Sequence, residues 1–153
     1  MTMLITIHSI LRWVVLGAIL YAIFKAWQGK QQQSAYSASD NQASLFAMIS
    51  CDIQLLIGLI LYFAGGLGLK NIQANGMGFV MSNAMSRFFA VEHISMMLLA
   101  IVLVHIGRSR SKKAATDGAK HNAVFIFYTI ALVLILASIP WPFREALGRT
   151  NWF

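Results

Sequence analysis

Four long apolar stretches divide the chain, and shorter polar segments separate them. The stretches cover about residues 4–26, 44–64, 88–107 and 122–139. A helix needs roughly 17 to 25 mostly apolar residues to cross a membrane, so each stretch predicts one transmembrane helix. Short connections make successive helices antiparallel neighbours. We therefore expect an all-α transmembrane four-helix bundle with up-down-up-down topology, forming a single domain over residues 1–153.

Composition supports a membrane protein and excludes several other classes. Only 11% of the 153 residues are charged and 58% are hydrophobic, whereas soluble domains average about 25% charged residues. The sequence contains no P-loop, no GxSxG elbow, no HExxH motif, no Gly-rich dinucleotide motif and only one cysteine. These absences argue against nucleotide-dependent, hydrolytic, zinc and iron–sulfur chemistry. The lipid bilayer is the expected surrounding of most of the chain.

Basic residues are distributed unevenly between the two ends of the expected bundle. The first and third connections together carry Lys25, Lys30, Arg108, Arg110, Lys112, Lys113 and Lys120, and the opposite end carries Lys70, Arg87, Arg144 and Arg149. Because cytoplasmic loops are enriched in Lys and Arg, we expect both termini on the outer, periplasmic side of a bacterial inner membrane. This distribution accounts for the net charge of +7 without any nucleic-acid partner.

The third apolar stretch carries ionisable side chains where contact with lipid is costly. It reads FFAVEHISMMLLAIVLVHIG and contains Glu92, His93 and His105. Ionisable groups within membrane spans usually face the interior of a bundle and mark functional sites. We therefore expect the functional site to involve this span.

Two histidines are expected at similar depth on helices that run in the same direction. At about 1.5 Å per residue, His8 lies roughly 10 Å and His93 roughly 7 Å from the middle of its span, both in the outer half. Diagonal helices of an antiparallel bundle face one central cavity, where cofactors are held. Two imidazoles, or one imidazole with Met96 or Met97, can bind a haem iron. The expected contacts of haem b are His8, His93, Met97 and Arg12, with His8 and His93 as the metal ligands.

Three motifs resemble a known family of membrane proteins. They are IHSILRW in the first span, DIQLLIGLILYF in the second and RFFAVEHISMM in the third, where a basic run follows. Together they resemble the small bacterial four-helix integral membrane proteins of a cytochrome b-like family, over nearly the whole chain. The resemblance implies that His8 and His93 face haem, and it leaves the role of Asp52 open.

Three charged residues form a second expected group. Arg12, Asp52 and Glu92 all fall inside apolar stretches, where an unpaired charge is expensive. We expect a buried charge network in which Arg12 forms a salt bridge with Glu92 or with Asp52. The alternative is that one carboxylate relays protons or tunes a bound cofactor or quinone. His105 and His121 flank the basic third connection, and we expect them at the interface rather than at a second haem.

These features predict a small b-type cytochrome-like protein that exchanges electrons with quinone or another redox partner. Such a protein is a membrane electron-transfer component or part of a haem-dependent oxidoreductase. The alternative is a non-catalytic accessory transmembrane subunit of a larger respiratory or transport complex, which the small size and the uncharged fourth span favour. A similarity to small membrane protoporphyrinogen oxidases, with Arg12 or Lys70 meeting a porphyrin carboxylate, lacks a close motif match. Homo-oligomerisation stays open.

Overall fold

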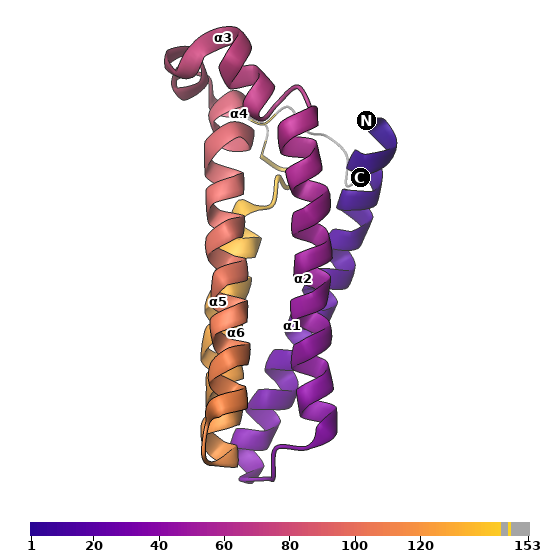
Figure 1. Ribbon diagram of the computed structural model, residues 1–153, viewed down its shortest axis with the longest axis vertical. Helices are drawn as coiled ribbons and strands as arrows, with labels where there is room; N and C mark the ends of the chain where they lie inside the picture. The colour runs from indigo at the N-terminus through magenta and orange to yellow at the C-terminus, as the bar shows by residue number, and fades with distance from the viewer. Residues whose placement is uncertain (145–146, 148–153) are drawn as a thin grey trace.

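The protein is an all-α bundle of long helices. The computed structural model describes residues 1–144 and 147. Its four longest helices are α1 (Thr2–Gln32), α2 (Ala38–Ala64), α5 (His93–Lys113) and α6 (Asp117–Ser138), and successive ones run in opposite directions (Figure 1). In the described part of the chain, four helical segments are long and apolar enough to span a membrane. The chain is therefore a multi-pass membrane protein by length and composition.

The packing order places α1 and α5 diagonally. Helix α1 packs against α2 and α6, and α5 packs against the same two helices. The core between them contains several small side chains, including Ala22, Ala100 and Ala131, all almost fully buried. Small residues let helix backbones approach closely within a membrane, where lipid tails remove much of the hydrophobic drive for association. The diagonal arrangement expected for the first and third spans is therefore present.

The first connection is much shorter than the polar composition suggests. Helix α1 continues to Gln32 and α2 already begins at Ala38, so the polar residues beyond the expected spans are mostly helical. Gln and Lys are good helix formers, and polarity alone does not end a helix. Helix α2 starts with a capping box, in which Ser37 and Asp40 satisfy each other's backbone N–H groups. The turn between the helices covers only residues 33–37.

The second connection is largely helical and lies at the other end of the bundle. Helix α3 (Leu69–Ser82) contains a kink at Gly76, whose φ of 80° suits glycine. It is followed by α4 (Ala84–Arg87) and by a π-helical turn, η1 (Phe88–Glu92), which leads directly into α5. The third candidate span thus runs from Ala84 to Lys113, longer than the expected 88–107.

The helix ends where α1 and α5 finish and α6 starts lie together at one end of the bundle (Figure 1). They carry a basic cluster, which defines the basic end of the bundle: Lys25, Lys30, Arg108, Arg110, Lys112, Lys113 and Lys120. The Lys30 ammonium donates a hydrogen bond to Asn122, 2.7 Å away. The buried guanidinium of Arg108 donates to Asn41 and Ser44 at 2.7 and 3.0 Å. These contacts join α1 to α6 and α5 to α2, and a salt bridge of 3.2 Å between Lys25 and Asp40 joins α1 to α2 at the same end.

Candidate functional site

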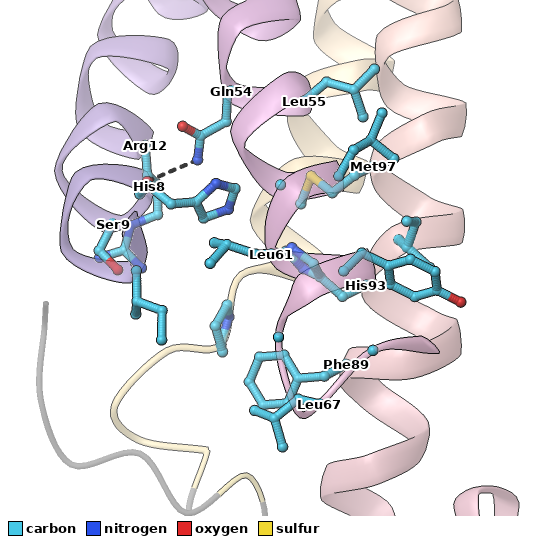
Figure 2. Close-up of a pocket in the computed structure, with 18 of the residues that line it drawn as sticks. His8, Ser9, Arg12, Gln54, Leu55, Leu61, Leu67, Phe89, His93 and Met97 are labelled. Atoms are coloured by element: carbon cyan, nitrogen blue, oxygen red, sulfur yellow. Dashed lines mark hydrogen bonds between the residues drawn. The ribbon is translucent and has the colours of Figure 1, made fainter. Parts of the chain in front are cut away.

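An apolar cavity of about 300 Å³ lies at the end of the bundle opposite the basic cluster. That volume is at the lower end of the range for small-molecule sites, roughly 300 to 1,000 Å³. Residues of α1, α2, η1, α5 and the end of α6 line the cavity, and Figure 2 draws most of these residues. All four residues expected to contact a cofactor line this cavity: His8, Arg12, His93 and Met97.

The structure brings the two expected ligand histidines together across the cavity. The rings of His8 and His93 face each other from α1 and α5 (Figure 2), with centroids 6.4 Å apart and planes inclined at 70°. If a metal–nitrogen bond measures about 2 Å, two imidazoles binding one metal from opposite sides have ring centres roughly 6 Å apart. The observed spacing therefore fits two ligands on opposite sides of one metal.

The orientation of the His93 ring is fixed by the backbone of α6. Its Nδ1 lies 2.7 Å from the carbonyl oxygen of Ser138. A carbonyl oxygen only accepts hydrogen bonds, so Nδ1 carries the proton and, in the neutral ring, Nε2 keeps its lone pair. The rings of Phe88 and Phe89 lie 5.8 and 6.5 Å from that of His93. Metal-binding histidines are typically held by such a hydrogen bond from the other ring nitrogen.

A π turn directly precedes His93. In η1 the backbone N–H of His93 bonds to the carbonyl of Phe88, five residues earlier, instead of the carbonyl four residues earlier. π turns inside α-helices occur frequently at functional sites. A π turn contains one residue more than an α-helical turn. The hydrophobic pattern of the sequence does not indicate this extra residue.

The His8 side of the cavity depends on two residues of α2 that sequence reasoning missed. The Gln54 amide Nε2 donates to the His8 backbone carbonyl over 2.9 Å (Figure 2), which ties the two helices together beside the ring. A β-carbon at Gly58 would stand 3.2 Å from His8 Cε1. Gly58 therefore leaves the space that the His8 imidazole occupies.

Arg12 adds a positive charge to the cavity wall one helical turn from His8. It is 8% exposed. Its guanidinium carbon lies 5.1 Å from the ring centre of Trp13 and 5.8 Å from that of Trp141. Contact with aromatic faces stabilises a desolvated guanidinium. Arg12 thus brings a guanidinium group, held against two indole rings, to the cavity wall.

Asp52 and Glu92, the carboxylates of the expected charge network, pair with residues other than Arg12. Glu92 accepts a hydrogen bond from Arg87 Nε at 2.8 Å. The π turn between them brings residues five apart onto one face. Asp52 Oδ1 lies 2.8 Å from His105 Nε2, and both residues are on the outside of the bundle. The expectation of one buried cluster around Arg12, Asp52 and Glu92 is therefore replaced by two separate surface pairs.

His121 is wholly buried inside the bundle, not exposed at an interface. Its ring lies so close to Gly29 that a β-carbon there would overlap it. The ring of Tyr36 also makes an edge contact with it, with centroids 4.9 Å apart. His121 and His105 therefore occupy different environments and do not form a second ligand pair.

Comparisons of the chain with protein-family models, with curated proteins and with solved structures gave no match. Kinship with the cytochrome b-like family therefore stays an expectation based on the three motifs.

Proposed function

We propose that this protein is a small b-type cytochrome-like membrane protein that binds haem b between α1 and α5. The observation that carries the proposal is the pair of imidazoles facing each other across the cavity at 6.4 Å. Helices α1 and α5 supply one ring each, as in four-helix bundles that hold a cofactor in their core.

The number of protein ligands favours haem over a bare metal ion. Within residues 1–144 and 147, no group of three or more His, Cys, Asp or Glu side chains is arranged to hold a metal. A bare zinc ion needs three or four protein ligands, and two imidazoles alone are too few. An iron already held by a porphyrin needs only axial ligands, for which two histidines suffice.

Each residue of the cavity has a definite role in this proposal. His93, oriented by the Ser138 carbonyl, and His8 would hold the haem iron through their imidazoles. Arg12 and Met97 would lie beside the porphyrin, and the apolar lining would keep water away from it. Bound there, haem supplies one-electron chemistry.

The proposed orientation follows from the basic end of the bundle. With that end in the cytoplasm, the cavity opens toward the outer half of a bacterial inner membrane. Electrons would then pass between the site and quinone or a redox partner within the membrane or at its outer face.

Visible spectra of detergent-purified protein, expressed with ample haem supply, test the proposal. We expect a reduced b-type α-band at close to one haem per chain. His93→Ala should abolish haem retention, whereas His105→Ala, which changes a histidine of the same helix outside the cavity, should keep it. Equal haem content in these two variants would contradict the assignment. A colourless wild-type protein that elutes as a folded species would instead favour the accessory-subunit alternative.

A further inference from the structure

The Asp52–His105 pair is an ionisable site on the lipid-facing surface of the bundle. The two side chains bridge α2 and α5, with 36% of Asp52 and 49% of His105 exposed. Ionisable residues in membrane spans almost always face the interior of a bundle or a water-filled cavity, so exposure at this depth indicates a functional site.

The depth of the pair places it within the hydrocarbon. Asp52 is eight residues, or about 12 Å, further along α2 than Ser44, which binds Arg108 at the basic end. His105 lies one turn before Arg108, and side chains on a helix lean toward its N-terminus, here toward the membrane centre. The residues around the pair are exposed and apolar, as expected for a lipid-facing surface: Ile49, Ile53, Leu56, Val102 and Ile106.

Each member of the pair keeps hydrogen-bonding capacity. The bond between His105 Nε2 and Asp52 Oδ1 uses one nitrogen and one oxygen. In the described part of the chain, His105 Nδ1 and Asp52 Oδ2 make no other hydrogen bond. A neutral His105 that donates from Nε2 has Nδ1 as an acceptor, and a protonated His105 has Nδ1–H as a donor.

We propose that this pair binds the head group of a membrane quinone. A ligand that reaches the pair laterally must dissolve in the bilayer, and it must offer oxygens that accept or donate hydrogen bonds. A quinone carbonyl would accept from Nδ1–H of protonated His105, and a quinol hydroxyl would donate to Nδ1 of neutral His105. One imidazole thus recognises both redox forms, and the bond between its Nε2 and Asp52 Oδ1 orients the ring.

The Asp52–His105 pair lies next to the cavity. Leu55 and Ile101, which line the cavity, lie within one helical turn of Asp52 and His105 respectively. The quinone site therefore adjoins the inner end of the proposed haem site. Its role in electron transfer rests on the proposed function, whereas quinone binding itself does not require haem.

A photoreactive azidoquinone with a ten-carbon tail, added to the full-length protein in lipid nanodiscs, tests this site. Cross-links should map to the segments around Asp52 and His105, and decylubiquinone should compete with them. His105→Gln removes the imidazole and Asp52→Asn removes the carboxylate that orients it. Each should weaken decylubiquinone binding about tenfold, as expected when one good hydrogen bond to the ligand is lost or misaligned. Asp117→Asn, which removes a carboxylate from the exposed pair with Lys120 at the basic end, should leave binding within about twofold.

The outcomes separate this site from the haem proposal. His93→Ala should lose haem and still bind decylubiquinone, so a failure of the haem proposal leaves the quinone test intact. Cross-links confined to other segments, or wild-type affinity in both pair variants, would overturn the quinone site. If the wild-type protein is a dimer and the two variants become folded monomers with unchanged quinone binding, a second copy of the chain covers the pair instead.

Discussion

The close contact between Gly29 and His121 predicts that a larger residue at position 29 would disrupt the packing of α1 against α6. A methyl group at Gly29 would overlap Cε1, Nε2 and Nδ1 of the His121 ring. The ring cannot move aside easily, because it is wholly buried and Tyr36 packs against it with centroids 4.9 Å apart. Gly29→Ala should therefore force α1 and α6 apart at the basic end of the bundle.

The stability that Gly29→Ala loses through overpacking should exceed the stability it gains from the higher helix propensity of Ala. Overpacking a well-filled core typically costs about 1 to 3 kcal/mol. Replacing Gly by Ala inside a helix stabilises it by roughly 0.5 to 1 kcal/mol, and less near an end such as this one, since α1 finishes at Gln32. We expect Gly29→Ala to lower the free energy of unfolding by about 1 to 2 kcal/mol.

The same helix supplies a matched control. Gly17 is exposed, and a β-carbon there would meet nothing within 4 Å. Gly17→Ala should therefore leave stability unchanged or raise it by up to about 1 kcal/mol. Both substitutions add one methyl group to α1, but only Gly29→Ala should lower the free energy of unfolding.

Cys51 provides the assay. It is the single cysteine of the chain and only 2% exposed, so a thiol-reactive fluorophore reports unfolding on heating. The Gly29→Ala midpoint should fall by roughly 2 to 4 °C per kcal/mol lost. In a His121→Ala background the same methyl should cost less, because the ring it overlaps is gone. A Gly29→Ala midpoint equal to that of Gly17→Ala would refute the packing argument.

Two further substitutions test the cavity and the first connection. Gly58→Val should displace the His8 ring, since even a β-carbon would stand 3.2 Å from it; we expect haem content to fall severalfold while Cys51 reactivity at room temperature stays low. Ser37→Ala should cost about 1 kcal/mol by removing the helix cap, measured as a lower midpoint in the Cys51 assay. A Gly58→Val protein with full haem content, or an unchanged Ser37→Ala midpoint, would contradict the respective contact.

Apolar length and the spacing of polar segments were sufficient to predict the spans. Hydropathy does not say where a helix ends, so the first two expected spans stop at residue 26 and resume only at residue 44. The structure continues α1 to Gln32 and starts α2 at Ala38 because Gln, Lys and Ser37 capping favour helix there. Boundaries in polar sequence depend on caps and propensity, and hydropathy reports neither.

The candidate site could be predicted only in part. Depth along a helix is nearly fixed by residue count, so residue count alone places His8 and His93 at similar depth, and the structure has their ring centroids 6.4 Å apart. The rotation of each helix about its own axis is harder to derive from the sequence, and the partners of Asp52 and Glu92 depend on that rotation. The contacts made by Gln54, Gly58 and the Ser138 carbonyl join residues far apart in the chain. No local pattern marks such contacts.

The π turn at Phe88–Glu92 acts as an angular spacer within the third span. It holds one residue more than an α-helix uses over the same rise. Deleting one residue there would keep the length and apolarity of the span, yet it would swing α3 and α4 about the helix axis by roughly 100° relative to α5. Two chains with the same hydropathy profile can therefore place α3 and α4 over different sides of the bundle. The presence or absence of one residue in the turn decides which side they cover.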